Sequence, residues 1–415
     1  MSCLRMASDC GKLSGSRFCV LGSRAQHDLI NKDLSVKAVI ICSPDEYANG
    51  VKPRELVRHL RGRGYEVDIF SSAYLSRAGK TGFAAVLPGP TFRQFALYLM
   101  EAVSVAVALV GRLQRSSART LTKWSVMKPM IQLRGAILRA RLAPAGYDII
   151  ICENNPDIGF IDGRRLARVQ ILDLPVPGAE EIYFGGLIGP RVYRKLRDYE
   201  IKLYAKADRV GFHWHTYATY VKENKYVGAN FIDLSYGADL PAKQALFNSQ
   251  PRIVFLGLLS GYWVNVPLLM RLCKIYPNID IYGGPRLAEL GDNYKGYAPT
   301  TDVLANYQFG LVTLTDDPLR RHSFSSKQLR YYSYGLPVLS PVWRRDDALD
   351  DAALLYDEEN FLNLIHENAN EPKWTELSIR ALKIARSYSW DEVLRPLDAL
   401  LTSPDDLAGR RVRGT

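Results

Sequence analysis

The sequence lacks the cysteine patterns of metal-binding and disulfide-rich proteins. None of its six cysteines forms a CxxC pair or another metal-ligand spacing, which argues against a zinc module. Cys42 and Cys152 end short apolar runs, as small core residues of a protein in a reducing compartment do. Residues 1–35 also lack the long apolar stretch of a signal peptide. We therefore expect a cytoplasmic protein with a disordered leader at 1–35 and a disordered tail at 403–415.

Motifs for dinucleotides and for zinc are missing as well. No GxGxxG follows a strand-like run, so the dinucleotide-binding fingerprint is absent. His213 and His215, in FHWH, would lie on one side of a continued strand, but no third ligand accompanies them. We expect no zinc there, and His213 becomes a candidate contact for an acceptor.

Acidic residues are nearly absent from residues 91–141, where nine basic residues accompany Glu101 alone. Most of the net charge of +11 therefore comes from one eighth of the chain, and an anionic partner is expected. Residues 95–111 carry one charge but are too short and interrupted for a clear membrane span. Three interpretations stay open: a buried helix followed by a solvated basic one, a membrane-surface element, or a true span. The candidate acceptor- or membrane-binding cations of this segment are Arg112, Arg115, Arg119, Lys123 and Lys128.

The order of apolar runs predicts an α/β protein. KAVIIC at 37–42, a helical pattern at 53–63 and VDIF at 67–70 form a βαβ unit with a parallel sheet. Turn-rich residues 237–251 interrupt the pattern before a second series begins at 252. We predict two Rossmann-like doubly wound domains facing a cleft, at 36–245 and 246–388, with a basic membrane-facing segment at 92–142 in the first. The helical segment 389–402 is expected to close the chain against the first domain.

One short helix carries a cation at its unfavourable end. SFSSKQLRYYSYGLPVLSP predicts a helix that begins near Ser325 or Ser326 and ends before Gly335. Lys327 lies in the first turn, where the helix dipole disfavours positive charge. Arg330 is its neighbour on the same face. A phosphate bound at the helix start would make both charges favourable, so we predict an anion site there.

Two glycine turns follow strands of the second series and are expected at the same edge of its sheet. Gly257 ends IVFLG, and Gly283 and Gly284 end IDIYGG. Glycine allows the backbone to approach a ligand closely. Tyr331, in the lysine helix, either packs on the sheet or faces a nucleotide.

The series FLG, IYGG, KGYAPTTDVLANYQFGLVTL and SSKQLRYYSYGLPVLSP resembles the nucleotide-sugar-binding half of GT-B glycosyltransferases. Within that fold it is most similar to the xanthan-type glucuronosyltransferase family. The resemblance covers residues 250–395 well and the earlier part of the chain only in its strand–helix rhythm. It implies that Lys327 contacts the donor diphosphate and that Arg330 stands where the family has a non-basic residue. The expected donor-binding residues are Lys327, Arg330, Ser325, Ser326, Gly257, Leu259, Gly283, Gly284, Tyr297 and Tyr331.

A catalytic base for inverting transfer is expected from the first domain. VQILDLP places Asp173 at the carboxyl end of a predicted strand, where it could take the acceptor hydroxyl proton. Glu153, after DIIIC, is the alternative. The aspartates of TDDP at 315–318 are adjacent, without the spacer of the Asp-x-Asp motif of metal-dependent GT-A enzymes. We therefore expect neither a divalent metal nor a cofactor.

These features together favour a glycosyltransferase. The expected donor is a nucleoside diphosphate sugar, UDP-linked, and the expected acceptor is a lipid-linked glycan reached from the inner face of the cell membrane. Hexosyl or uronosyl transfer in polysaccharide or glycolipid assembly would fit. Two alternatives are a nucleotide-sugar epimerase of the same fold and a non-catalytic membrane-bound scaffold. Nucleic acid is not an expected partner, because the basic segment has only Trp124 among its cations.

Overall fold

The computed structural model describes residues 36–42, 51–71, 124–226, 228–284, 286–323, 325–344 and 348–401. From Lys37 onward these residues belong to one compact unit. The expected leader and tail, residues 95–111, and Arg112, Arg115, Arg119 and Lys123 lie outside the described residues.

The first of two sheets has five parallel strands in the order β2-β1-β3-β4-β5. Its strands are short, and the central ones, β1, β3 and β4, are buried except at the first residue of β1 and β4, as strands covered on both faces by helices are. The strands are β1 (Lys37–Cys42), β2 (Glu66–Ser71), β3 (Ile149–Cys152), β4 (Val169–Leu174) and β5 (Arg209–Phe212).

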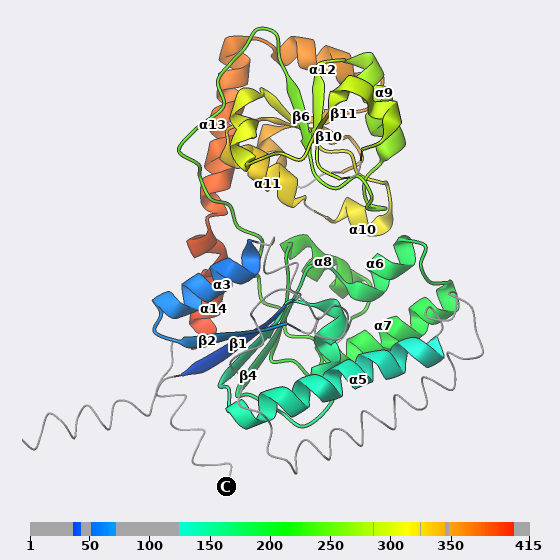
Figure 1. Ribbon diagram of the computed structural model, residues 1–415, viewed down its shortest axis with the longest axis vertical. Helices are drawn as coiled ribbons and strands as arrows, with labels where there is room; N and C mark the ends of the chain where they lie inside the picture. The colour runs from blue at the N-terminus through cyan, green and yellow to red at the C-terminus, as the bar shows by residue number, and fades with distance from the viewer. Residues whose placement is uncertain are drawn as a thin grey trace, which may run out of the picture. The chain divides into compact units, whose positions relative to one another are not determined.

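Helices connect these strands, and Figure 1 shows two of them, α5 and α7, running alongside one another. The α-helices of this half are α3 (Lys52–Gly62), α5 (Trp124–Leu142), α6 (Gly178–Phe184), α7 (Pro190–Tyr204) and α8 (His215–Glu223). Two 3₁₀ turns, η3 (Ala143–Ala145) and η4 (Asn155–Ile161), flank β3.

The basic helix α5 packs into the first half of the protein and uses its cations there. A Cβ at Gly135 would lie 2.3 Å from the backbone of Gly159 in η4, so only glycine permits this approach. Arg134 pairs with Asp157 at 2.8 Å, and Arg139 donates to the Gly159 carbonyl at 3.1 Å. Lys128 lies over the Tyr199 ring. The described part of the basic segment is therefore largely engaged in internal contacts, which its charge pattern alone did not show.

The second sheet has six parallel strands in the order β11-β10-β9-β6-β7-β8. Its strands are β6 (Ile253–Leu256), β7 (Ile279–Tyr282), β8 (Tyr294–Gly296), β9 (Phe309–Leu311), β10 (Val338–Pro341) and β11 (Ala353–Tyr356). Its α-helices are α9 (Val266–Ile275), α10 (Pro318–Arg321), α11 (Ser326–Ser333), α12 (Phe361–Asn368) and α13 (Glu371–Ser387), with 3₁₀ turns η5 (Ala288–Asn293), η6 (Thr301–Asn306) and η7 (Asp350–Ala352). Two parallel sheets with covering helices confirm the predicted α/β class.

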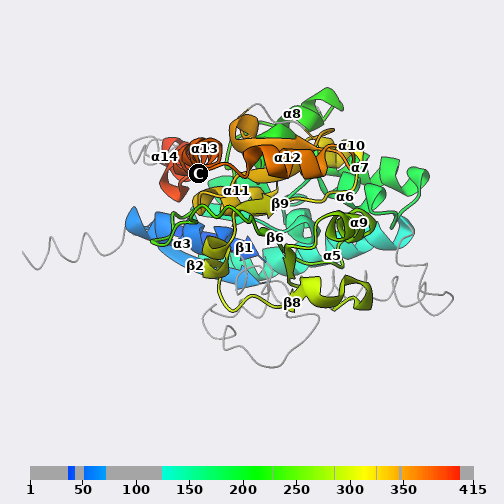
Figure 2. The ribbon, with the colours of Figure 1, turned by 90° about the horizontal axis from the view of Figure 1, so that it is seen from above.

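The last helix, α14 (Trp390–Leu401), follows α13, as Figure 2 shows, and contacts α3 of the first half. Nε2 of His59 in α3 lies 2.8 Å from Oδ1 of Asp398 in α14. The linker meets the same junction, because Ala238 N–H donates to the Tyr388 carbonyl at 2.8 Å. Both chain crossings between the sheets are thus held by backbone and side-chain bonds.

Residues 230–234 do not form a strand, although their apolar side chains would permit one. Only an isolated bridge joins Phe231 to Val210 there, because the segment runs along the edge of β5 without a continuous ladder. Strands β8 and β11 were not predicted: both are short edge strands with incomplete burial, so neither shows the continuous apolar run by which buried strands are recognised.

No helix in the described ranges is long and apolar enough to cross a membrane. Cys42, Cys152 and Cys273 are buried and none of these three is in a disulfide.

Candidate active site

The lysine helix α11 begins as its sequence predicts, and its first turn faces a cavity. Ser325 has extended backbone angles at the N-cap position, yet its side chain makes no capping hydrogen bond. Ser325, Ser326 and Lys327 instead line a cavity of about 290 Å³. Gln328 N–H donates to the Ser325 carbonyl at 2.8 Å. The N–H groups of Ser326 and Lys327 have no acceptor among the described residues, so they are left for another acceptor.

Lys327 has no counter-ion in the part of the chain that the structure describes. Its ammonium lies over the Phe255 ring, 4.5 Å from the centroid, and no carboxylate among the described residues is within ion-pair distance. Burial, together with the nearby charge of Arg330, lowers the pKa of Lys327 to about 8. Arg330 likewise has no ion pair within the described ranges. Lys327 at the uncapped helix start makes a candidate anion site. Arg330 lies in the last turn of α11 and does not line the cavity.

The glycine turns pack directly on this lysine. Gly257 has φ +154°, and a Cβ there would lie 2.2 Å from Lys327 Cε. Gly283 and Gly284 also have positive φ, and a Cβ on either would strike the backbone at Gly257 or Leu259. Leu259 is buried behind these turns. The structure thus brings the predicted turns and the lysine into one cluster, with Tyr297 standing apart as a 72% exposed side chain.

Replacing Gly257 with alanine tests this contact. Gly257→Ala should displace the Lys327 side chain and weaken nucleotide-sugar binding about tenfold, the effect of losing one charge-assisted hydrogen bond. Titration calorimetry measures it. Gly186→Ala is the matched control, since Gly186 also has positive φ (+71°) but no heavy atom within 4 Å of the added Cβ. Equal donor affinity in Gly257→Ala and the parent would contradict the proposed role of this turn.

Tyr331 does not face the cavity. It is fully buried, its ring packs on Gly310, and its hydroxyl accepts from Leu256 N–H at 2.8 Å. The expectation that it contacts the donor is corrected accordingly: Tyr331 ties α11 to β6.

Arg344, also buried, holds the loop before the helix by donating to the Ser323 carbonyl at 2.8 Å and to Gln328 Oε1 at 2.8 Å.

The opposite wall of the cavity comes from the first half of the protein. His213 and Trp214, after β5, face it together with Tyr236. From the second half come the first turn of α11 and Trp263. The lining is Pro175, Val176, Glu181, His213, Trp214, Tyr217, Tyr236, Trp263, Leu314, Arg320, Ser323, Ser325, Ser326 and Lys327.

Behind His213 lies a buried ionic cluster. Lys52, the first residue of α3, pairs with both carboxylate oxygens of Asp173, at 2.9 and 2.8 Å. Its ammonium also donates to the Leu234 carbonyl. Asp173 has no exposed surface and Lys52 has 1%. Burial raises the pKa of Asp173, and the Lys52 charge and a hydrogen bond with Glu153 offset part of that rise.

His213 is the member of this cluster that reaches the cavity. Its Nε2 is buried with no hydrogen-bond partner among the described residues. Burial and the Lys52 charge hold the pKa of His213 well below its usual value, so the ring is neutral at pH 7. A neutral imidazole with an unfilled nitrogen can accept a proton from a hydroxyl placed beside it.

Glu153, Asp173 and His213 could also hold a cation. One ligand atom of each lies within 4.8 Å of the others. The Lys52 ammonium lies 2.8 Å from Asp173, so one of the three candidate ligands is already paired with a cation in the folded chain. The cluster therefore fits a proton-holding network better than a metal centre.

A second set of contacts joins the two halves at the cavity. Arg320 of α10 pairs with Glu181 of α6 at 2.5 Å and donates to Tyr262 Oη at 2.8 Å. Its guanidinium also lies over the Tyr262 and Trp263 rings. Arg320 is thus neutralised, in contrast to Lys327 a short distance along the chain.

Sequence reasoning missed Lys52, although the same feature that singled out Lys327 was present. Both lysines lie in the first turn of a helix, where the dipole disfavours a cation. Lys52 finds its anion inside the protein, and Lys327 finds none among the described residues. Arg320 and Arg344 carried no comparable feature, because only tertiary contacts neutralise or bury them.

The Lys52–Asp173 pair makes a strong stability prediction. Lys52→Met leaves a fully buried carboxyl without its cation, and we expect the free energy of unfolding to fall by about 3–5 kcal/mol. Urea denaturation measures this. Lys195→Met, at an exposed lysine, should change stability by less than about 0.5 kcal/mol. A loss as small as that of the control would mean that Asp173 is not ionised in the native protein.

Comparisons with solved structures identify the fold that carries this site. The chain is similar to sucrose-phosphate synthase from Thermosynechococcus elongatus, with a TM-score of 0.62 and 13% identity over 90% of this chain and 100% of that one. The fold is GT-B.

Two further structures share it at lower similarity. An α,α-trehalose 6-phosphate synthase from Burkholderia multivorans matches with a TM-score of 0.55 and 12% identity, over 90% of this chain and 100% of that one. A glycosyltransferase from Rickettsia africae matches with a TM-score of 0.52 and 9% identity, over 89% of this chain and 100% of that one. No family model matches the chain, and no curated protein sequence does. The predicted GT-B fold is confirmed, while the xanthan-type resemblance stays a prediction.

Proposed function

We propose that this protein is a glycosyltransferase that moves a sugar from a nucleoside diphosphate sugar to an acceptor hydroxyl. The observation that carries the proposal is the unpaired Lys327 at the uncapped start of α11. Its counterpart Lys52 is neutralised by Asp173. A lysine beside a cavity, without a counter-ion among the described residues, calls for an anionic ligand, and ligands of open α/β sheets bind at the carboxyl ends of the strands.

The chemistry follows from where charge develops. As the sugar–phosphate bond breaks, negative charge grows on the leaving diphosphate, and preformed cations and N–H groups stabilise it best. Lys327 and the first turn of α11 stand at the cavity before the donor arrives, and Arg330 adds positive charge from the last turn of the same helix. No step in this account requires a divalent cation. The donor sugar, whether hexosyl or uronosyl, and a UDP leaving group are parts of the proposal taken from the family resemblance.

For the base we propose His213, backed by Asp173 and Glu153. Asp173 was the expected base, but it is fully buried and paired with Lys52, so an acceptor in the cavity meets His213 first. His213 would take the acceptor proton during an inverting attack. Asp173 and Glu153 would then stabilise the imidazolium as positioning residues.

A membrane-associated, lipid-linked glycan is the acceptor that we propose, with the enzyme peripheral on the inner face of the cell membrane and acting in polysaccharide or glycolipid assembly. The support is the excess of basic residues at 91–141. In its described part these cations serve internal contacts. The proposal therefore depends on Arg112, Arg115, Arg119 and Lys123, which lie outside the described residues.

The pKa of Lys327 predicts an unusual pH dependence of donor binding. Lysine in an unfolded chain titrates near 10.5, and Lys327 in the folded protein near 8. A diphosphate favours the charged form, so donor affinity should be constant below about pH 8 and fall up to about tenfold per pH unit above it. The lowered pKa of Lys327 has the opposite effect on folding. The free energy of unfolding should rise from pH 8 to 10.5, because in that range the unfolded chain still binds a proton that the folded chain has lost. Calorimetric titration of UDP from pH 6 to 10 measures the first effect, and a flat profile would contradict it.

A screen of nucleotide sugars tests the function itself. Purified protein is incubated with UDP-, GDP- and dTDP-sugars, and stabilisation is followed by thermal unfolding. Binding with transfer to an added lipid-linked acceptor supports the proposal. Conversion of the donor to its epimer without an acceptor would favour the epimerase, and no nucleotide binding would favour the scaffold.

A further inference from the structure

A second cavity lies at the other end of the second sheet. It has a volume of about 410 Å³ and opens between the amino ends of β6 and β7. Arg252 lines this cavity and precedes β6, whereas Gly257, which packs on Lys327, follows the same strand. At about 3.3 Å per residue, these two ends are roughly 16 Å apart. The cavity is therefore separate from the site of Lys327.

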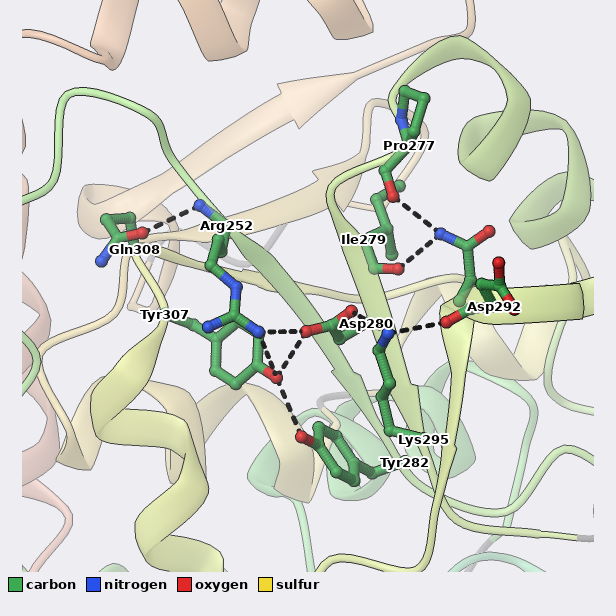
Figure 3. Close-up of polar contacts among 10 residues, drawn as sticks. Arg252, Pro277, Ile279, Asp280, Tyr282, Asp292, Lys295, Tyr307 and Gln308 are labelled. Carbon is green, nitrogen blue, oxygen red and sulfur yellow. Dashed lines mark hydrogen bonds and ion pairs between the residues drawn. The ribbon is translucent and has the colours of Figure 1, made fainter.

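A polar network joins three of the residues that line this cavity, Arg252, Asp280 and Lys295, to two tyrosines (Figure 3). Asp280 accepts from Tyr307 Oη at 2.8 Å, pairs with Arg252 Nη2 at 2.5 Å, and lies 3.4 Å from Lys295 Nζ. Tyr307 Oη is also 3.0 Å from Tyr282 Oη. Asp280 is 7% exposed, so its carboxylate contacts these side chains and hardly any solvent.

Several polar groups remain available beside that network. The side-chain contacts of Arg252 with Asp280 and Tyr307 both go through Nη2, which leaves Nε and Nη1 as donors. Asn293 Nδ2 donates to the carbonyls of Pro277 and Ile279, at 2.8 and 2.7 Å. Those bonds fix the amide plane and present Oδ1 as an acceptor. Gln250 and Asn278 add two more amides to the lining.

The composition of the lining selects the ligand. Two cations, Arg252 and Lys295, are balanced by two carboxylates, Asp280 and Asp292, so an anion such as a phosphate gains no net attraction. Pro277 is the one apolar side chain among the lining residues, so an apolar ligand is disfavoured too. A lining that offers both hydrogen-bond donors and acceptors suits a neutral molecule with many hydroxyl groups.

We propose that this cavity binds an uncharged sugar unit of a glycan, away from the site of transfer. Planar amide, carboxylate and guanidinium groups can each contact two neighbouring hydroxyls of a sugar ring, and here the network fixes them in advance, which lowers the entropic cost of binding. The site would hold a distant part of a glycan whose end lies elsewhere. It does not depend on the proposed transfer reaction.

Saturation-transfer NMR with the full chain and uncharged disaccharides (cellobiose, maltose and mannobiose) tests the site, with UDP present to occupy the other cavity. We expect saturation transfer to at least one disaccharide. Asn278→Ala and Lys295→Met, both at side chains with substantial exposure, should weaken that binding roughly tenfold. Lys274→Met, at an exposed lysine outside the lining, is the matched control and should bind like the parent.

Three results would overturn the assignment. One is no transfer to any of the disaccharides. Another is binding that is unaffected by Asn278→Ala and Lys295→Met but lost in Lys327→Met, which would place the sugar in the other cavity. The third is tighter binding of glucuronic acid than of glucose, because the balanced charges of the lining give a carboxylate no advantage.

Discussion

Lys327→Met should reduce sugar transfer by about 10²–10³-fold, the usual effect of removing one preformed group that stabilises the developing negative charge. Methionine keeps the length of the side chain against Phe255 and Gly257, so the substitution removes the charge with little change in packing. The free energy of unfolding should not fall, because a cation without a counter-ion is lost. Steady-state kinetics and urea denaturation measure the two quantities.

Arg321→Ala is the matched control for this prediction. Arg321 lies in the same stretch of chain, but it is largely exposed and pairs with Asp316 at 2.7 Å, and it does not line the cavity. Its removal should leave transfer within about twofold of the parent, as expected for an exposed pair. Unchanged turnover in Lys327→Met would remove the basis of the diphosphate site and, with it, the main support for the proposed function.

His213→Gln should lower transfer by about 10²–10⁴-fold, the range for loss of a general base, while UDP affinity stays within a factor of about two. Glutamine retains a polar side chain of similar length but cannot take a proton at neutral pH. The pH–rate profile adds a specific test: the activity loss at low pH, where His213 becomes protonated in the parent, should disappear from the residual rate.

Asp173→Asn separates the base from the residues that position it. If His213 is the base, Asp173→Asn should lower transfer less than His213→Gln and should also weaken folding, because Lys52 then loses its carboxylate. Nearly normal transfer in His213→Gln, together with complete loss in Asp173→Asn at intact stability, would return the role of base to Asp173. That outcome would require Lys52 to move away during turnover.

The choice between His213 and Asp173 shows where sequence reasoning ends. Asp173 follows a buried strand, and a carboxylate at that edge of a parallel sheet is a sound candidate. What the pattern did not contain is Lys52, 121 residues earlier in the chain, which turns Asp173 from a free carboxylate into half of a buried pair. His213 was noted only as a possible acceptor contact, and its unfilled Nε2 is visible only in three dimensions.

Sequence by itself determined the two-sheet α/β plan, because fully buried parallel strands must be short apolar runs separated by helices. It also predicted the anion site that we propose at α11, since a lysine in the first turn of a helix, flanked by serines and glycine turns, is a local pattern. Tertiary structure alone decided which lysine is neutralised and which is not, because ion pairs form between residues far apart in the chain. It likewise decided that Tyr331 is a packing residue and that Arg252, Asp280 and Lys295 share a second cavity.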